Sequence, residues 1–172
     1  MRMWFDTEFI EDGKTIDLVS IGIVAEDGRE FYAEAAGVDY SRASEWVQEH
    51  VIKHLWHRQD SKRDANIWIR DGGRGGLMSR QQIAREIQTF CDPQLHGEPE
   101  FWAYYADYDW VVLCQLFGRM IDLPRGWPMY CRDLKQWADQ YGIGLSEEVG
   151  EPKDEHHALA DARWNRQAWE FL

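Results

Sequence analysis

The chain has 172 residues, 44% hydrophobic and 14% aromatic, so it can bury a sizeable core as one domain over residues 1–172 and is too apolar to be disordered. No apolar run approaches the ~20 residues that span a bilayer, and the first six residues hold no signal-peptide core, so we expect a cytoplasmic protein. The net charge of −12 argues against a broad basic surface for nucleic acid, although a carboxylate cluster that binds divalent cations would itself be acidic.

The N-terminal third is predicted to be an antiparallel meander of three strands. Residues 3–9 form a short apolar stretch that carries acids, residues 16–24 are rich in β-branched side chains, and residues 30–35 return as a third strand. The turns between them each contain Asp-Gly, and strands joined by such tight turns pair antiparallel.

The pattern then changes to helical spacing. Residues 40–55 are predicted to form a helix with Ser41 as its N-cap and an apolar face made of Trp46, Val47, Val51 and Leu55. Residues 57–78 are polar and contain a glycine-rich run, which predicts a mobile loop or an insertion. No Gly-Lys-Ser/Thr sequence follows those glycines, so a phosphate-binding P-loop is not expected.

Positive charge is concentrated in and just after this segment. Seven basic residues face only three acidic ones there, namely Arg58, Lys62, Arg63, Arg70, Arg74, Arg80 and Arg85 against Asp60, Asp64 and Asp71. A solvated surface loop and a contact with the RNA backbone both explain this bias, and the sequence leaves the two readings open.

Helices and strands alternate through the rest of the chain. A helix capped by Ser79 and closed by Pro93 is expected to turn Ile83, Ile87 and Phe90 inward. Further helices are predicted at 107–120, 132–141 and 157–172, and strands at 100–105 and 128–131. The whole pattern predicts an α/β fold whose central mixed sheet has about five strands, the first three antiparallel, and is flanked by helices.

The motif Asp6-Thr7-Glu8 is the first candidate for chemistry. Residues two apart on a strand point to the same side, and their Cα atoms lie about 7 Å apart, so both carboxylates can reach shared metal ions. Without a cation, repulsion and burial would raise the pKa of one of them. A strand end that faces water is the competing reading of this motif.

Asp109 is the second candidate, because it follows a predicted buried strand at the head of a helix. Ligands of open α/β sheets bind at such strand ends. We expect Asp107 to cap the helix and Asp109 to bind metal, although both acids could serve as caps.

His156 and Asp161 form the third candidate. Five residues turn a helix through roughly 500°, so the two side chains would not share a helix face. A His156 placed on the loop before the helix could instead reach the site that Asp161 faces and take a proton from water. Adjacent histidines at the start of a surface helix are the plainer reading.

Together, four carboxylates from three segments and one histidine match the needs of metal-assisted phosphodiester cleavage. Two ions ~3.5–4 Å apart activate a water and stabilise the leaving oxygen in such sites. Carboxylate oxygens favour two Mg²⁺ ions, or Mn²⁺ in their place, over zinc. The three cysteines, Cys91, Cys114 and Cys131, match neither a zinc spacing nor a disulfide framework and are expected to be buried thiols.

The order of these motifs resembles that of the DEDDh exonucleases, a superfamily with an RNase H-like fold. Residues 5–13, 20–30 and 113–116 look like those of the branch called RNase AS, whose members are adenylate-preferring exoribonucleases that act as dimers. The resemblance implies a homodimer that hydrolyses single-stranded RNA from its 3′ end, with polyadenylate as one such substrate, to nucleoside 5′-monophosphates. Residues 56–78 depart from the family pattern by their length.

The resemblance also assigns roles to residues. Asp6, Glu8, Asp109 and Asp161 would hold the metals, with Asp109 chosen because it follows an aromatic residue. His156 would be the general base, chosen over His157 for its His-x₄-Asp spacing. The candidates for contact with the substrate are Phe9, Ile10, Trp102, Tyr105 and Trp110. An exonuclease for single-stranded DNA and a non-catalytic RNA-binding module remain as alternatives.

Overall fold

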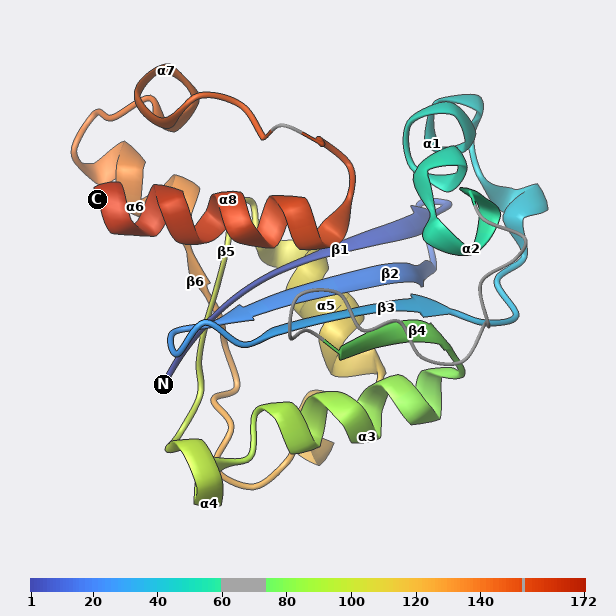
Figure 1. Ribbon diagram of the computed structural model, residues 1–172, viewed down its shortest axis with the longest axis horizontal. Coiled ribbons are helices and arrows are strands. Elements are labelled where there is room, and N and C mark those ends of the chain that lie inside the picture. Colours follow the sequence, from blue (N-terminus) through green and yellow to red (C-terminus); the bar gives the residue numbers. More distant parts are fainter. Residues whose placement is uncertain (60–73, 153) are drawn as a thin grey trace.

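A six-stranded mixed sheet with helices on both faces organises the protein, as the computed structural model shows for residues 1–59, 74–152 and 154–172 (Figure 1). The strand order is β4-β3-β2-β1-β5-β6. The strands are β1 (Arg2–Glu11), β2 (Ile16–Ala25), β3 (Glu30–Ala35), β4 (Arg74–Met78), β5 (Glu100–Ala103) and β6 (Arg132–Asp133). The first three strands pair antiparallel, whereas β4, β5 and β6 each join the sheet in parallel. The predicted α/β class and antiparallel meander are therefore confirmed.

The helices differ widely in length. They are α1 (Glu45–His50), α2 (Trp56–Gln59), α3 (Arg80–Phe90), α4 (Pro93–His96), α5 (Asp107–Gln115), α6 (Leu134–Gln140), α7 (Leu145–Val149) and α8 (Ala158–Phe171). Short 3₁₀ turns lie at η1 (Tyr40–Arg42), η2 (Ile52–His54) and η3 (Met120–Asp122). Among the residues described, no helix is both long and apolar enough to cross a bilayer.

The alternation of β1 divides the core into two layers. Met3 and Phe5 face the side covered by α3 and α5, while Trp4 faces the side covered by α8. Side chains two apart on a strand share a face, so Asp6 and Glu8 continue the row of Trp4 toward α8. Both carboxylates therefore lie on the α8 side of the sheet.

Helix α8 lies unusually close to β2. Gly22 pairs with Asp6 across the β1–β2 ladder, and a Cβ at this glycine would lie 2.4 Å from backbone atoms of Ala158 and Leu159. The start of α8 therefore packs directly on the strand backbone beside Asp6. About two turns further along α8, Asn165 Nδ2 donates a hydrogen bond to the Phe5 carbonyl at 2.8 Å.

A third apolar cluster anchors the segment that leads to α2. Ile10 of β1 and Val19 of β2 pack against Val51, Ile52 and Leu55. The predicted helix over 40–55 is in fact broken into η1, α1 and η2.

The capping prediction for that segment is wrong. The Ser44 hydroxyl, and not that of Ser41, caps α1 by accepting the Val47 N–H at 3.2 Å. Ser41 instead donates its hydroxyl to Asp39 at 2.6 Å. Both serines carry a hydroxyl that can cap a helix. Because the chain breaks after η1 and α1 begins only at Glu45, Ser44 is the one in the capping position.

Other element boundaries also differ from the prediction. Residues 74–78 of the predicted loop form strand β4 beside β3, and α2 occupies 56–59. Residues 60–73, with three of the seven basic residues of the cluster, lie outside the described residues. The expected strand at 128–131 is instead β6 at Arg132–Asp133, and α7 had no predicted counterpart. Asp133 caps α6 by accepting the Gln136 N–H at 2.7 Å, which starts that helix at Leu134.

Helix α3 follows the prediction closely. Ser79 and Gln82 form a reciprocal capping box, and Ile83, Ile87 and Phe90 are buried. The three cysteines are free, with Cys91 and Cys114 buried.

Candidate active site

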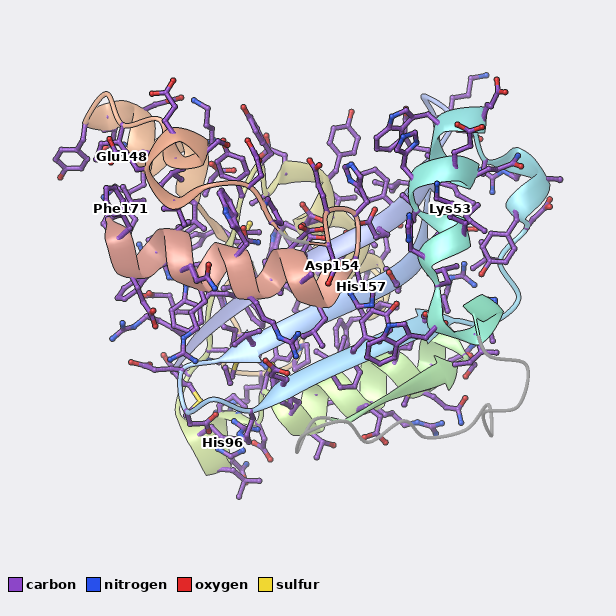
Figure 2. The ribbon with its side chains drawn as sticks, turned by 45° about the horizontal axis from the view of Figure 1, so that its top comes forward. Lys53, His96, Glu148, Asp154, His157 and Phe171 are labelled. Atoms are coloured by element: carbon purple, nitrogen blue, oxygen red, sulfur yellow. The ribbon has the colours of Figure 1, made fainter. Side chains whose placement is uncertain are left out.

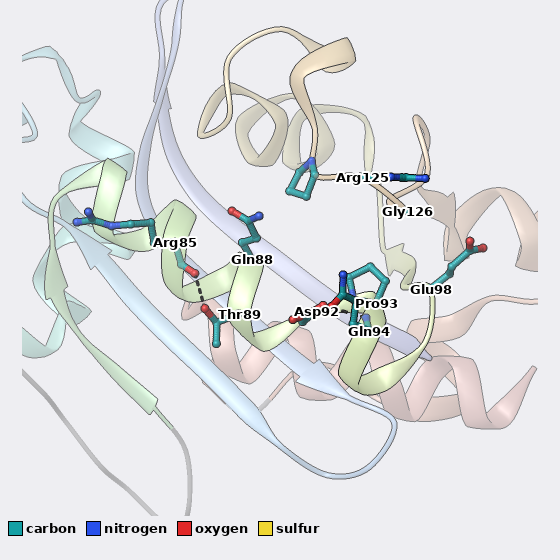
Figure 3. A pocket seen from close by; sticks show the side chains of 10 residues that line it. Arg85, Gln88, Thr89, Asp92, Pro93, Gln94, Glu98, Arg125 and Gly126 are labelled. Carbon is teal, nitrogen blue, oxygen red and sulfur yellow. Dashed lines mark hydrogen bonds between the residues drawn. The ribbon is translucent and has the colours of Figure 1, made fainter.

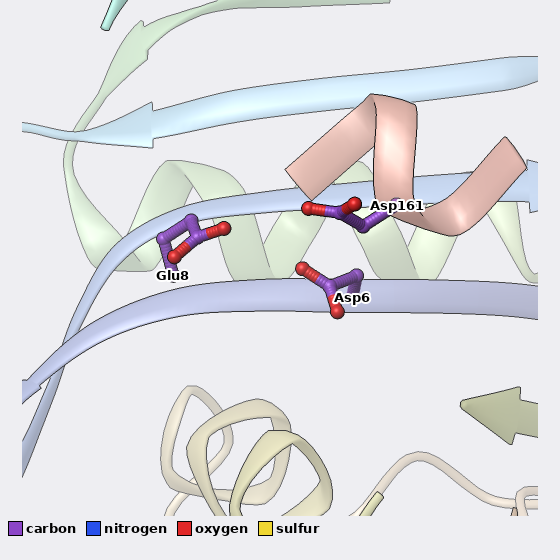
Figure 4. Close-up of side chains that lie close together, drawn as sticks. All are labelled: Asp6, Glu8 and Asp161. Carbon is purple, nitrogen blue, oxygen red and sulfur yellow. The ribbon is translucent and has the colours of Figure 1, made fainter. Parts of the chain in front are cut away.

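Three carboxylates meet where β1 passes beneath the first turn of α8. One oxygen from each of Asp6, Glu8 and Asp161 lies within 4.8 Å of the others (Figure 4). Asp6 and Glu8 reach this point because they share a strand face, and Asp161 because Gly22 lets α8 approach. A divalent cation is the kind of ligand that such converging oxygens hold.

Asp109 approaches the same point from the edge of β1. Strand β5 pairs with residues 2–4 of β1 and then ends, so the first turn of α5 lies beside the next stretch of the strand. Oδ1 of Asp109 accepts the Thr7 N–H at 2.9 Å and the Thr7 hydroxyl at 2.5 Å. These two bonds occupy one carboxylate oxygen and leave the other for a metal ion.

Asp107 does not cap α5, contrary to the prediction. The N-cap is Ala106, which has no side-chain cap, and Asp107 is an exposed member of the first turn. The Ala106 N–H is satisfied instead by Asp133 Oδ2 at 2.7 Å. Asp133 of β6 thereby ties the N-cap residue of α5 to the sheet.

Burial and neighbouring negative charge raise the pKa of each of the four acids in the absence of a cation. For Asp6 and Glu8, burial raises the pKa most, and the charges of Asp109 and Asp161 raise it further. Burial raises the pKa of Asp109 to about 6 and that of Asp161 to about 7, although hydrogen bonds from Thr7 and from the backbone of His156 counteract these shifts. Ionised acids this close need positive charge among them.

His156 lies on the turn before α8, the placement that lets it share a site with Asp161. Its φ is 67°, a left-handed conformation that is uncommon for residues other than glycine. Nε2 lies 3.8 Å from Glu155 Oε1, and the ring lines the same cleft as the acids. His157 points elsewhere, since its ring is stacked on Tyr32 with centroids 4.6 Å apart.

The cleft that contains these groups has a volume of about 470 Å³. One wall is aromatic. Phe9 stacks on Tyr108 with centroids 5.9 Å apart, and Tyr105 and Tyr108 are 61% and 59% exposed. Flat exposed rings beside a metal-binding acid cluster suit a nucleobase.

The complete chain, residues 1–172, matches the family described as the 3′-5′ exoribonuclease Rv2179c-like domain. The chain belongs to this family. Two curated relatives, the 3′-5′ exoribonucleases Rv2179c and MT2234.1 of two Mycobacterium tuberculosis strains, are each 42% identical over 164 residues. These alignments cover 95% of this chain and 88% of each relative.

A solved structure supports the fold. The Neurospora crassa Pan2 catalytic unit (protease and nuclease domain) matches with a TM-score of 0.52 and 13% identity. The match covers 98% of this chain but 26% of that chain, so this protein spans about a quarter of its length. Together these findings confirm the resemblance to the DEDDh superfamily and the RNase H-like fold.

Two of the residues expected to contact substrate line the cleft. Phe9 and Tyr105 are part of its wall. Ile10, Trp102 and Trp110 do not line the cleft, so the structure does not support the prediction that these three side chains contact the substrate.

These three side chains are core residues. Ile10 packs in the third apolar cluster, against the segment that precedes α2, at 1% exposure. Trp110 packs on Phe5 and Phe101, and Trp102 packs among the rings on the α8 side of the sheet. Large rings are far more often core than binding surface, and burial separates the two cases.

Sequence reasoning missed Thr7, Tyr108 and Glu155 as parts of this site. Thr7 lies between Asp6 and Glu8, and Tyr108 immediately precedes Asp109. Their position next to predicted metal ligands was the signal in the sequence that could have identified them. Glu155 lines the cleft and raises the pKa of Glu8 and Asp161 by its charge. Its contribution depends on the turn before α8, which the sequence pattern does not specify.

A larger hollow of about 740 Å³ lies between α3, α4 and residues 124–126 (Figure 3). Arg85 and Arg125 contribute positive charge to it, and Asp92 and Glu98 contribute negative charge. None of the five candidate catalytic residues lines this hollow. Its size alone therefore does not make it the reaction site.

Proposed function

We propose that the protein is a 3′→5′ exoribonuclease that hydrolyses single-stranded RNA to nucleoside 5′-monophosphates by a two-metal mechanism. The observation that carries this proposal is the convergence of Asp6, Glu8 and Asp161, with Asp109 and His156, in one cleft. Family membership and 42% identity to relatives named 3′-5′ exoribonucleases support the same activity.

The residues fit Mg²⁺ or Mn²⁺. All four acids offer oxygen ligands. Burial raises the pKa of each and nearby negative charge adds to the shift, a cost that divalent cations would offset. Asp6, Glu8, Asp109 and Asp161 would hold the ions. Bound ions would polarise the scissile phosphodiester and stabilise the leaving 3′ oxygen.

His156 is the general base in this proposal. Its position on the turn before α8 brings the imidazole to the rim of the acid cluster while leaving it accessible to water. The ring takes the proton of the water that attacks phosphorus. Asp161 accepts hydrogen bonds from the backbone of His156 and His157, which couples the base to one metal-binding acid.

Phe9 and Tyr108 are proposed to receive the 3′-terminal base. Stacking on an aromatic ring contributes roughly 1–3 kcal/mol per base. Purines overlap such a surface more than pyrimidines do, which agrees with a preference for adenylate. That preference and action as a homodimer are proposed on the resemblance to RNase AS, and light scattering would test the dimer.

The test is a cleavage assay on 5′-labelled single-stranded homopolymers with Mg²⁺. The expected result is a ladder shortening from the 3′ end, release of nucleoside 5′-monophosphates, and faster loss of oligoadenylate than oligouridylate. Asp109→Asn is expected to abolish turnover, whereas the matched Asp107→Asn is expected to retain it, since Asp107 is exposed on the same helical turn.

Three outcomes would contradict the proposal. Cleavage that survives EDTA would exclude the metal mechanism. Equal rates on oligodeoxyadenylate would favour the DNA exonuclease alternative. RNA binding without cleavage, combined with no Mg²⁺ uptake by calorimetry, would indicate a non-catalytic binding module.

A further inference from the structure

Trp46 lies beside the proposed general base but has no role in the mechanism above. Its side chain, in the first turn of α1, is 51% exposed. Single exposed apolar side chains are common and need no explanation by themselves. The partners of this indole are what single it out, because it contacts the rings of both His50 and His156.

His50 holds the indole in place. The two rings are stacked with centroids 4.7 Å apart and an interplanar angle of 11°. His50 Nδ1 also donates to the Trp46 carbonyl at 2.9 Å, which fixes the histidine ring one helical turn from the residue it covers. Stacked aromatic pairs contribute roughly 0.5–1.5 kcal/mol beyond their buried area, so the pair restricts the indole.

The segment that carries Trp46 is itself firmly attached. Its C-terminal end reaches α2, where fully buried Glu34 accepts the Trp56 N–H at 2.5 Å and the His57 Nδ1–H at 2.7 Å. Trp56 in turn packs on Tyr32 and on His157, at centroid distances of 4.5 and 5.2 Å. Figure 2 places His157 where the chain enters α8.

His156 needs such support. It occupies a turn, with φ at 67°, and its side chain projects from the chain just before α8 begins. Within the part of the chain that the structure describes, its ring meets Trp46 edge to face at 4.7 Å, His50 at 6.3 Å and the Glu155 carboxylate at 3.8 Å. Of these contacts, the one with Trp46 is a close apolar contact that restricts ring rotation.

We propose that Trp46 is a positioning residue for the reaction, holding the His156 imidazole toward the acid cluster while His50 holds Trp46. This inference rests on the proposed function, in which His156 takes the proton of the attacking water. Misplacement of a catalytic group by about 1 Å can reduce a rate about 100-fold. Loss of one ring contact, which only widens the range of orientations, is expected to reduce kcat about tenfold.

The test compares Trp46→Ala and Trp46→Phe with wild type on oligoadenylate and Mg²⁺. Trp46→Ala is expected to lower kcat about tenfold with KM unchanged, and Trp46→Phe to recover most of the loss because it keeps a ring at the contact. Phe171→Ala serves as the matched control, since Phe171 is 48% exposed at the opposite end of α8 and is expected to leave kcat unchanged. Circular dichroism checks that each variant is folded.

A second measurement does not depend on activity. In metal-free protein, the imidazole Hε1 resonance of His156 feels the ring current of Trp46, so it is expected to move in Trp46→Ala and not in Phe171→Ala. An unmoved resonance or an unchanged kcat overturns the proposal, and so does a raised KM at constant kcat, which would make Trp46 an RNA contact. A wild-type protein without nuclease activity would overturn the proposed function, while the resonance would still decide whether Trp46 holds His156.

Discussion

Replacing Thr7 by valine tests whether the Thr7 hydroxyl keeps Asp109 ionised for metal binding. The change removes the hydroxyl that donates to Asp109 Oδ1 at 2.5 Å and keeps the β-branched shape and the backbone N–H that also donates there. Both side chains are buried, at 4% and 6% exposure, so water does not replace the lost donor. A hydrogen bond to a charged group contributes about 1.5–3 kcal/mol.

Loss of the Thr7 hydroxyl is expected to destabilise the ionised form of Asp109. Burial raises the pKa of Asp109 to about 6 even though the Thr7 hydroxyl lowers it, so loss of the hydroxyl raises this pKa further toward neutrality. Metal binding then has to displace a proton from more of the molecules. At about 1.4 kcal/mol per tenfold, Mg²⁺ affinity and kcat/KM at limiting Mg²⁺ are expected to fall about 10- to 100-fold near neutral pH.

Calorimetric titration with Mg²⁺ and cleavage rates over a series of Mg²⁺ concentrations measure this effect. Thr7→Ser keeps the hydroxyl and is expected to behave much like wild type. Saturating Mg²⁺ or higher pH is expected to restore part of the Thr7→Val loss, because both favour the ionised acid. Equal impairment of the serine and valine variants would show that the methyl group matters and refute the hydrogen-bond argument.

Three further changes test other parts of the site. Gly22→Ala places a methyl against the Ala158 backbone, so we expect a loss of roughly 1–3 kcal/mol or more in the free energy of unfolding by urea, together with lost activity. Tyr108→Ala removes a stacking surface and is expected to raise KM for oligoadenylate roughly 5- to 100-fold with a smaller change in kcat, as steady-state assays would show. The folded-state pKa values of Asp109 and Asp161, about 6 and about 7, exceed the usual value near 4. In metal-free protein, the contribution of these two acids to folding stability is therefore present at low pH and is lost as the pH rises through their folded-state pKa values. Thermal unfolding with and without Mg²⁺ is therefore expected to show a larger stabilisation by Mg²⁺ near pH 7.5 than near pH 5.5, and a constant difference would contradict this.

The strand pattern and the candidate acids were accessible from sequence for a physical reason. Alternation along residues 3–9 places Asp6 and Glu8 on one face whatever surrounds them, and the turn chemistry that joins the first three strands is local. Helical spacing separated His156 from Asp161 and left a position before the helix as one reading, which the resemblance to the DEDDh exonucleases favoured. What the pattern could not supply is the approach of α8 to β2, which depends on Gly22 having no side chain.

The remaining errors have tertiary causes. Strand β4 contains Gly75 and Gly76, residues of low β-propensity, and its pairing with β3 involves positions far away in sequence. The core positions of Trp102 and Trp110 could not be separated from binding positions by residue type, since both roles favour large rings. Ile10 shares a strand face with Glu8 but is covered by Val51, Ile52 and Leu55, a tertiary contact that the strand pattern does not specify.

The hydrogen bond between Asn165 and the Phe5 carbonyl joins residues 160 positions apart, and the acid cluster beside it extends from Asp6 to Asp161. During synthesis, the strand with Asp6 and Glu8 leaves the ribosome well before His156, Asp161 and Asn165 do. A growing chain therefore carries two acids of the cluster without the base or the helix that completes it. The cluster of Asp6, Glu8 and Asp161 is complete only once α8 docks on the sheet.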